Sequence, residues 1–183
     1  MSEIYSPRED SEQLAKEVEE YSFSKVLDMG TGSGIQGITA LKNKNTKQVL
    51  CLDVNPEAIK HVKSRIKKEN LSNISVLESN LFSNLNQEDK FDTIIFNPPY
   101  LPNEENDEDI ALYGGPEGWE IPVKFLEEAK NYLSKNGQIL FLFSSLTIKE
   151  KIDETILKQN MKFEQLSEQS LFFEKLNVYK ITF

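Results

Sequence analysis

The sequence predicts an α/β fold: a Rossmann-like, seven-stranded, mostly parallel sheet with helices on both faces and an antiparallel hairpin at the C-terminal end. Two observations support this prediction. Short apolar runs alternate along most of the chain with amphipathic stretches of helical period, a pattern typical of parallel strands joined by crossover helices. Near the C-terminus two strand-like segments follow each other directly, which indicates an antiparallel pair.

The first expected element is a helix that begins near Ser6. Ser6 is suited to cap its first turn, Pro7 fits the first helical position, and Glu9 completes a capping box. No low-complexity linker or internal repeat divides the chain. We therefore expect one domain over residues 1–183, with residues 1–24 as its helical N-terminal cap.

The remaining elements follow from the apolar pattern. We expect strands at 25–29, 48–54, 74–79, 91–96, 138–144, 162–169 and 171–183. We expect helices at 33–42, 55–70, 119–134 and 148–160. The helix that begins near Trp119 is predicted to end near Asn136-Gly137, because glycine commonly terminates helices.

Composition excludes several classes of protein. With 38% hydrophobic residues among 183, the chain can bury a substantial core. No apolar run reaches the roughly 18 residues that a membrane span needs, and the N-terminus does not resemble a secretory signal. The single cysteine, Cys51, excludes a disulfide framework and a cysteine-based metal cage. These observations predict a cytoplasmic protein without a metal site.

The net charge of −9 argues against a nucleic-acid partner, because proteins that bind phosphates usually present a basic face. The basic run Lys60–Lys68 contains the only histidine, His61, and has a helical pattern. We expect this run to be a solvated helix face. The acidity favours a small-molecule, protein or basic partner.

Glycine-rich or polar residues follow four successive strands. The turn Asp28–Gly34 (DMGTGSG) follows the first strand, Asp53 the second, Asn80 the third, and Asn97–Tyr100 (NPPY) the fourth. Ligands of open parallel sheets bind beyond the carboxyl ends of the strands. The turn has neither the glycine spacing of a dinucleotide fingerprint nor the lysine of a Walker A loop. Together the four sites describe a nucleoside-bearing cofactor with a reaction site at one end.

Two of these sites have specific hydrogen-bonding capacities. Asp53 can accept from both hydroxyls of a ribose. Its alternative role, as cap of the next helix, suits Asn55 better, because Pro56 marks the start of that helix, and this leaves Asp53 free. The amide of Asn80 can both donate to and accept from an adenine edge.

The segments YSPREDS, VLDMGTGSG, LDVNPEA, SNLF, FNPPYLP and LYGGPEGWE resemble class I S-adenosylmethionine-dependent methyltransferases, and within them the HemK family of release-factor glutamine methyltransferases. The similarity extends from about Tyr5 to the C-terminus. NPPY alone is shared with methyltransferases that act on adenine, whereas NPPY followed by GGPEGWE is similar to the HemK family. The short form, which opens with PREDS and has LSEQSLFFEKLNVYKI near its end, resembles the archaeal and eukaryotic branch.

The resemblance implies S-adenosyl-L-methionine as cofactor and a glutamine side-chain nitrogen (N5), in the Gly-Gly-Gln motif of a peptide-chain release factor, as methyl acceptor. It also implies a small zinc-ribbon activator protein as a heterodimer partner. Asn80 stands where the family usually has Asp, and Asp28 replaces a frequent Glu. The cofactor contacts expected from the strand ends and the resemblance are Ser11, Asp28, Met29, Gly30, Thr31, Gly32, Gly34, Asp53, Val54, Asn80, Leu81 and Asn97.

The NPPY segment suggests how such a transfer would be catalysed. A carboxamide nitrogen is a poor nucleophile but a sulfonium methyl group is strongly activated, so catalysis mainly requires positioning. We expect the Asn97 side-chain oxygen and the Pro98 carbonyl to accept the two N–H groups of the target and to stabilise its developing charge. Pro99 stiffens the segment, and Tyr100 packs against the amide plane. No general base is required.

Three other functions remain open at this point. Asn97 and Tyr100 would also suit an exocyclic amine of adenine or guanine in DNA or RNA, although the net charge and the lack of a target-recognition domain argue against it. A lysine amine is tetrahedral and gains little from a planar clamp. The third alternative is an inactive scaffold that binds the cofactor, against which the intact Asp53, Asn97 and Tyr100 argue.

The segment between NPPY and the next helix is acidic. Residues 103–109 are expected either to be solvated or to accept a basic protein domain. Tyr113 and Trp119 are either core anchors or substrate contacts, and we expect Trp119 to belong to the core.

Overall fold

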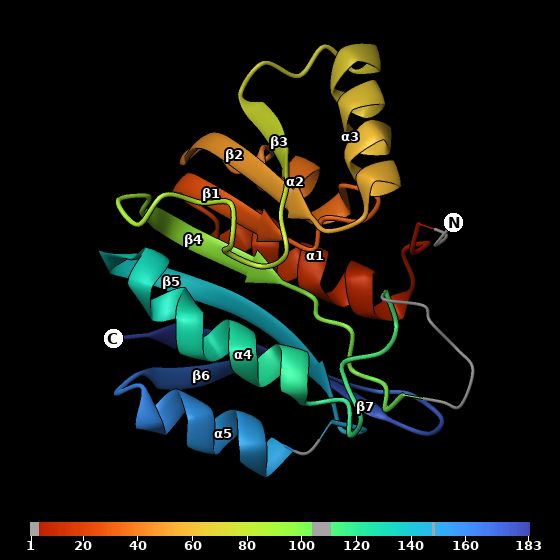
Figure 1. The fold of residues 1–183 in the computed structure, drawn as a ribbon, viewed down its shortest axis with the longest axis vertical. Helices are drawn as coiled ribbons and strands as arrows, with labels where there is room; N and C mark the ends of the chain where they lie inside the picture. Colours follow the sequence, from red (N-terminus) through yellow and green to blue (C-terminus); the bar gives the residue numbers. More distant parts are fainter. Residues whose placement is uncertain (1–3, 104–110, 148) are drawn as a thin grey trace.

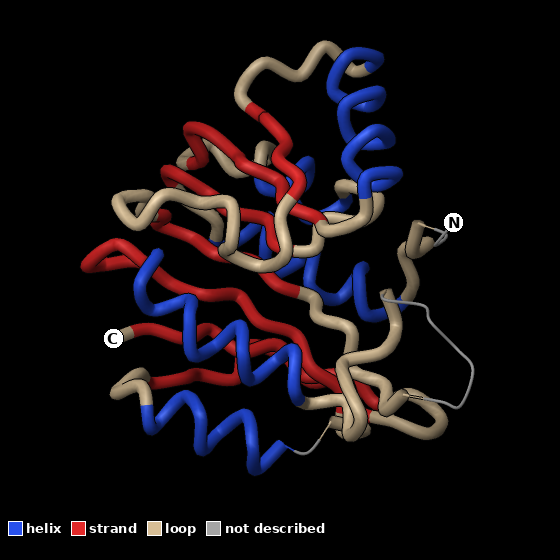
Figure 2. Tube along the Cα trace, in the orientation of Figure 1, coloured by secondary structure: helices blue, strands red, loops and turns tan. Residues whose placement is uncertain are grey.

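The computed structural model describes residues 4–103, 111–147 and 149–183, which form a seven-stranded sheet with helices on both faces (Figures 1 and 2). The strands are β1 (Ser24–Met29), β2 (Thr46–Asp53), β3 (Ile74–Glu78), β4 (Phe91–Phe96), β5 (Leu133–Ser144), β6 (Lys162–Ser170) and β7 (Lys175–Thr182). The helices are α1 (Glu9–Tyr21), α2 (Ile35–Ala40), α3 (Pro56–Lys68), α4 (Glu120–Ala129), the 3₁₀ turn η1 (Lys130–Tyr132) and α5 (Lys149–Lys158).

The strand order is β3-β2-β1-β4-β5-β7-β6. From β3 to β5 all neighbours pair in parallel, and β7 is antiparallel to both β5 and β6. The predicted fold class, a mostly parallel sheet with an antiparallel C-terminal hairpin, is therefore confirmed. The strand order reverses at β1, so the carboxyl ends of β1 and β4 border the crevice where such sheets bind ligands.

Two apolar layers cover the sheet, one on each face. On one face Leu14 of α1 and Val62 of α3 pack with strand residues that include the buried Cys51. On the other face Phe125 of α4 and Ile152 of α5 pack against the opposite side chains of the strands. The central strands are therefore apolar on both sides, as parallel strands buried between helices must be.

The ring of Phe125 links α4 to the end of β4. It contacts Phe96, the last residue of β4, at 4.4 Å between ring centroids, and it also stacks near Phe82 and Phe141 at 5.5 and 5.9 Å. Aromatic pairs at such distances add to the stabilisation from area burial. Because Phe96 directly precedes NPPY, this packing fixes the point from which the segment departs.

The predicted start of the first helix is wrong. Helix α1 begins at Glu9, and its N-cap is Arg8 in an extended conformation, without a side-chain cap bond. Ser6 therefore does not cap the helix, and Pro7 lies before it. The Tyr5 hydroxyl donates to the Asp10 carboxylate at 3.1 Å, which ties the preceding extended segment to the first turn.

The predicted end of the fourth helix is also wrong, because Asn136-Gly137 lies inside β5. Leu133 pairs with Phe91, and the next registered pair is Gln138 with Thr93. Extra residues of β5 therefore bulge out of the ladder between these pairs. Gly137 does not have a left-handed backbone, but a Cβ at this position would lie 2.9 Å from the Phe91 carbonyl oxygen and from the Leu133 side chain, so the bulge has no room for a larger residue.

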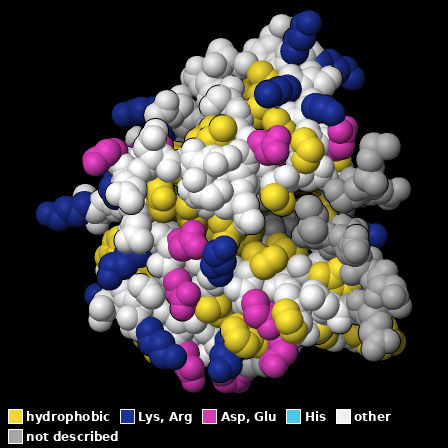
Figure 3. All heavy atoms as spheres, in the orientation of Figure 1, with side chains coloured by type: hydrophobic (Ala, Val, Ile, Leu, Met, Phe, Trp, Pro, Cys, Tyr) yellow, Lys and Arg dark blue, Asp and Glu magenta, His cyan; other side chains and the backbone are white. Residues whose placement is uncertain are grey.

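The last strand begins later than predicted, because residues 171–174 form the turn between β6 and β7 rather than part of a strand. The predictions for the surface are confirmed. His61 is exposed, and lysine and arginine side chains gather over α3 at the top of Figure 3. Among the described residues no helix has the length and apolar character needed to cross a membrane.

We predict that Phe125→Ala lowers the free energy of unfolding by about 3–5 kcal/mol, because it empties a fully buried ring position. The matched control is Phe172→Ala, since that ring is 91% exposed and its loss should change stability by less than about 0.5 kcal/mol. Urea denaturation followed by circular dichroism measures both. Equal losses in the two variants would contradict the central role of Phe125.

Candidate functional site

A cavity of about 540 Å³ lies at the carboxyl ends of β1 to β4, within the usual range for small-molecule and cofactor sites. Most residues that the sequence predicted for the site line it: Ser11, Met29, Gly30, Thr31, Gly32, Asp53, Val54, Asn80, Leu81, Asn97, Pro98, Pro99 and Tyr100. Asp28 and Gly34, which were predicted with them, are absent from this lining.

Asp28 supports the glycine turn from beneath. Its side chain is 1% exposed, and its Oδ2 accepts hydrogen bonds from the Thr31 hydroxyl at 2.5 Å and the Gly37 N–H at 2.9 Å. Burial raises the pKa of this carboxyl to about 7, against the hydrogen bonds, which lower it. Asp28 therefore links β1, the glycine turn and α2. Its side chain does not line the cavity and affects it only by fixing the backbone of the turn.

Asp53 ends β2 at the cavity wall. One of its oxygens accepts from the Asn55 N–H and the other from the Gly32 N–H, both at 2.8 Å. As predicted, Asp53 does not cap α3, but both of its oxygens already accept from backbone N–H groups, and its contact with a ribose stays a prediction. Asn55 caps α3 by accepting from the Glu57 N–H at 3.0 Å, as predicted. Burial raises the pKa of Asp53 as well.

The loop that follows β3 is held by a hydrogen bond from the hydroxyl of one of its own residues, Ser79. Ser79 Oγ donates to the Leu81 carbonyl at 2.7 Å, and Leu81 has a left-handed backbone with φ of 48°. A non-glycine residue in this region is strained by about 1–3 kcal/mol, and such strain tends to accumulate at functional sites. Asn80 is exposed and lines the cavity, where its contact with an adenine edge stays a prediction.

Asn97 is fixed by a residue far away in the sequence. Its Nδ2 donates to Asp10 Oδ2 at 2.8 Å, and this bond determines which end of the amide carries the nitrogen. The other end, Oδ1, is buried and has no hydrogen-bond partner among the described residues. The Tyr5 hydroxyl donates to the same Asp10 carboxylate. The chain Tyr5–Asp10–Asn97 thus presents one fixed, unsatisfied acceptor beside the cavity.

Two glycines of the GGPEG segment pack directly against NPPY. A Cβ at Gly114 would lie 2.5 Å from the Pro99 carbonyl oxygen, and one at Gly118 would lie 2.5 Å from the Tyr100 carbonyl oxygen. The Gly114 N–H donates to the Leu101 carbonyl at 2.9 Å. Any other residue at these positions would displace the backbone of NPPY, which explains why the two segments occur together.

The sequence did not identify Asp10, Tyr5 or Glu174 as site residues, although all three line the cavity. Asp10 stands beside the selected Ser11, but nothing in the local pattern shows that it meets a residue 87 positions later. Glu174 comes from the turn between β6 and β7. Burial raises the pKa of Tyr100, the charges of Glu174 and Asp10 raise it further, and the charge of Arg8, which also lines the cavity, lowers it. Charges of both signs therefore act on Tyr100 at this end of the cavity.

Two remaining expectations have different outcomes. The acidic segment 103–109 lies, apart from Asn103, outside the described residues. Trp119 is half-buried rather than a core residue: its indole N–H donates to Glu117 at 3.0 Å, and Lys151 lies over its ring. Tyr113 is also half-buried and pairs with Leu101 through an isolated bridge.

The sequence model of the Methyltransferase small domain family matches residues 8–173. A proposed protein N5-glutamine methyltransferase of Methanocaldococcus jannaschii is 38% identical over 181 residues, which cover 96% of this chain and 90% of that protein. A release factor glutamine methyltransferase of Rhodopirellula baltica is 30% identical over 152 residues, which cover 77% of this chain. The aligned region spans about half of that bacterial protein, 51% of its length.

Solved structures share the fold. The Mtq2–Trm112 complex of E. cuniculi, described as responsible for methylation of the eRF1 translation termination factor, matches with a TM-score of 0.75 and 24% identity over 97% of each chain. TrmK of M. capricolum in complex with S-adenosyl-homocysteine matches with a TM-score of 0.69 and 15% identity, over 97% of this chain and 69% of that one.

We predict that the free energy of unfolding falls between pH 5 and pH 8, because Asp28 has a pKa of about 7 in the folded protein and an ordinary value near 3.8 when unfolded. A carboxyl with a raised folded pKa stabilises the fold fully below the unfolded value, and that contribution is lost as the pH rises through the folded value. One such group contributes a slope of at most about 1.4 kcal/mol per pH unit.

Urea denaturation at pH 5, 6, 7 and 8 measures this slope. Asp28→Asn should flatten it, leaving the contribution of Asp53, which has the same sign. Asp92→Asn is the matched control, because Asp92 has a lowered pKa and titrates below this window. A slope in Asp28→Asn as steep as in the wild type would contradict the assignment.

Proposed function

The chain belongs to the methyltransferase small domain family, within the group of protein N5-glutamine methyltransferases, and we propose that it methylates the side-chain amide nitrogen of a glutamine. The proposed acceptor is the glutamine of the Gly-Gly-Gln motif in a peptide-chain release factor, and the proposed methyl donor is S-adenosyl-L-methionine. The observation that carries the proposal is the unsatisfied Oδ1 of Asn97, which is buried beside the cavity and oriented by Asp10.

The cavity has the features that S-adenosyl-L-methionine requires. Asp53 provides carboxylate oxygens for ribose hydroxyls, and the glycine turn lets the backbone approach a ligand closely. The exposed amide of Asn80 is available for the adenine edge, and Ser11 lies where the α1 end of the cavity could meet the amino-acid part. When bound, this cofactor supplies an electrophilic methyl group on a sulfonium.

The residues of NPPY are proposed to hold the target nitrogen. Its two N–H groups would donate to Asn97 Oδ1 and to the Pro98 carbonyl, which places the target amide in one plane. Tyr100, from the cavity wall, would pack against that plane. Filling the orphaned acceptor recovers the roughly 1–3 kcal/mol that an unsatisfied buried polar group costs, so binding and orientation of the amide are coupled.

The surrounding charges support the same chemistry. An uncharged amide nitrogen becomes positively charged as it gains a methyl group, and fixed negative groups stabilise that change. Asp10 lies one hydrogen bond from Asn97, and Glu174 acts on Tyr100 from the opposite segment. Electrostatic positioning therefore accounts for the proposed transfer without a general base, because the methylated nitrogen is acidic enough to lose its proton to water.

A protein substrate fits this site better than a nucleic acid. The net charge of −9 would repel phosphates. We extend the proposal to a cytoplasmic protein that acts as a single catalytic domain. A small zinc-ribbon activator is proposed as its heterodimer partner, a proposal supported by the presence of a second, small protein in the Mtq2–Trm112 complex.

The test is to incubate the protein, alone and with the activator protein, with labelled S-adenosyl-L-methionine and one substrate at a time. The substrates are the release factor, ribosomal RNA and plasmid DNA of the same organism. We expect peptide mass spectrometry to find one added methyl group on the Gly-Gly-Gln glutamine. Asn97→Ala should lower kcat by about 10²–10³-fold and retain cofactor binding. Label confined to nucleic acid would establish the nucleobase alternative instead.

We predict that exchanging Asp10 and Asn97 partly restores the activity that Asn97→Asp alone destroys. Asn97→Asp alone places two carboxyl groups at the 2.8 Å contact and breaks it by like-charge repulsion. In the double variant Asp10→Asn/Asn97→Asp, the amide at position 10 can donate to the carboxylate at position 97. The other carboxylate oxygen then takes the place of the lost acceptor.

Initial rates with the release factor measure this exchange as kcat for the wild type, both single variants and the double variant. We expect kcat of the double variant to exceed that of Asn97→Asp by about tenfold or more, since non-additivity is the mark of residues in contact. Independent, additive losses would show that Asp10 does not position Asn97.

A further inference from the structure

Two phenylalanines are exposed at the turn between β6 and β7. Phe172 is 91% exposed and Phe173 86% exposed, more than any other large hydrophobic side chain among the described residues. Their rings contact each other edge to face, with centroids 4.6 Å apart. Scattered apolar side chains are normal on protein surfaces, but adjacent aromatic rings form a patch of the kind that marks an interaction site.

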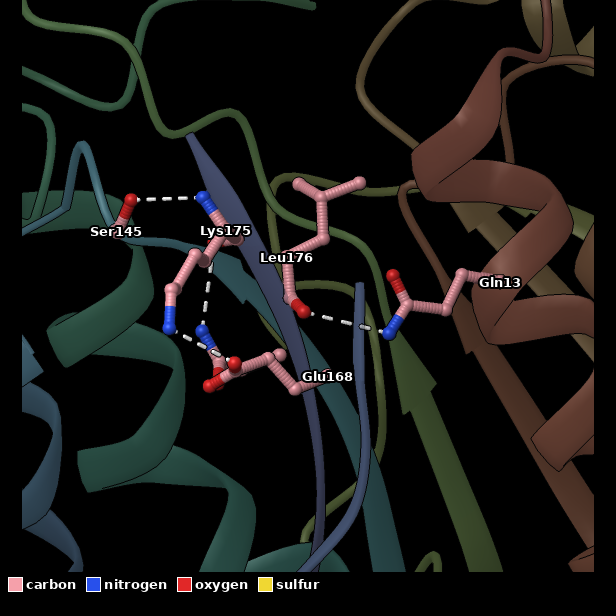
Figure 4. A network of polar contacts seen from close by, with 6 residues as sticks. Gln13, Ser145, Glu168, Lys175 and Leu176 are labelled. Atoms are coloured by element: carbon pink, nitrogen blue, oxygen red, sulfur yellow. Dashed lines mark hydrogen bonds and ion pairs between the residues drawn. The ribbon is translucent and has the colours of Figure 1, made fainter. Parts of the chain in front are cut away.

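The turn that carries these rings is firmly held. The Leu171 N–H donates to the Glu174 carbonyl at 2.8 Å and closes the turn. The Ser145 N–H donates to the Lys175 carbonyl at 2.8 Å, the Lys175 N–H donates to the Ser145 hydroxyl at 2.9 Å, and the Lys175 side chain pairs with Glu168 at 2.9 Å (Figure 4). The rings are therefore displayed by an ordered hairpin end, which reduces the entropy lost when a partner binds.

The hairpin is also bound to the helix that forms one wall of the cavity. Gln13 of α1 donates from Nε2 to the Leu176 carbonyl at 3.3 Å (Figure 4) and to the Ser167 hydroxyl at 3.2 Å. Asp10 and Ser11 of the same helix line the cavity. The position of the turn is thus fixed relative to the residues that orient Asn97.

The phenylalanine pair lies at the acceptor end of the cavity rather than the cofactor end. The next residue, Glu174, lines the cavity, acts on Tyr100, and bonds the Ser144 hydroxyl. Figure 1 shows the β6–β7 turn projecting at the same end of the sheet as the segment that follows β4. Leu146, 45% exposed, lies on the neighbouring β5–α5 turn and extends the apolar rim.

We propose that the Phe172–Phe173 turn is a docking surface for the domain that carries the target glutamine, an inference that rests on the proposed function. A glutamine side chain is short, so the backbone that carries it must rest on the cavity rim when its amide reaches Asn97. The rim next to Tyr100 is formed by this turn. Its occupant is an apolar patch of the folded substrate domain, beside the Gly-Gly-Gln loop.

The rings serve a protein surface rather than a base. Aromatic rings also stack on unpaired bases, but here the carboxylate of Glu174 directly follows the rings in the sequence. This charge and the net charge of −9 oppose the phosphates that accompany any base. The turn therefore selects the macromolecule, whereas NPPY selects the planar nitrogen.

The test compares wild type, Phe172→Ala/Phe173→Ala and the control Leu157→Ala in methylation of full-length release factor, with the activator protein present throughout. Leu157 is 62% exposed near the end of α5, which leads into the start of β6, whereas the phenylalanine turn follows the other end of that strand. Truncating two central aromatic contacts is expected to raise KM for the factor about tenfold or more. The values of kcat and the cofactor dissociation constant should stay within about twofold, because NPPY and the cavity are untouched.

The outcomes separate this inference from the proposed function. A wild type that methylates no release factor overturns both. A wild type that methylates the factor, with an unchanged KM in the double variant, overturns the docking surface alone. If the double variant instead loses the activator protein or self-association, as measured by light scattering, while KM for the factor is unchanged, the turn binds another partner and the inference is wrong. Circular dichroism confirms that each variant is folded.

Discussion

The functional end of this protein depends on the parallel pairing of β1 with both β2 and β4. Met29, the last residue of β1, lies opposite Leu52 of β2 and Phe96 of β4, so the three strands end nearly level. Parallel pairing requires crossover connections, which return the chain to the end of the sheet where the previous strand began. The glycine turn, Asp53 and Asn97 consequently meet at one edge, although the sequence places them far apart.

At that end of the sheet, the hydrogen bonds of two polar side chains, Asp28 and Asn97, are satisfied to different extents. Asp28 is satisfied by the Thr31 hydroxyl and the Gly37 N–H, and its role ends in holding the turn. Asn97 is satisfied only on its nitrogen side, by Asp10. Gln13 and Gln36 are likewise bonded through their nitrogen and have a buried oxygen without a partner among the described residues. What distinguishes Asn97 is its place in NPPY at the cavity, and this place is what makes its oxygen the proposed acceptor for a ligand.

The sequence was sufficient for the sheet and its C-terminal hairpin, because apolar periodicity is a local signal, and the strand ends together with the family resemblance gave site residues most of which line the cavity. Two local signals misled. Asn136-Gly137 has the composition of a helix terminus but lies in a bulge of β5, where tertiary pairing with β4 outweighs local preference. Ser6 is of a residue type that commonly caps helices, but the contact between Tyr5 and Asp10 determines the path of the chain before α1. Asp10 and Glu174 could not be found this way, because their roles arise only from long-range contacts.

One electrostatic feature can serve both catalysis and the choice of substrate. The target nitrogens of glutamine and adenine are both planar and both carry two N–H donors, so Asn97 cannot distinguish them. They differ in what surrounds them, since adenine in a nucleic acid brings phosphates and glutamine in a protein does not. The carboxylates of Asp10 and Glu174 act on Tyr100, and in the proposed function they would stabilise a nitrogen that becomes cationic, while the net charge of −9 would oppose an approaching phosphate. The same excess of negative charge would therefore favour both the transfer and a protein substrate.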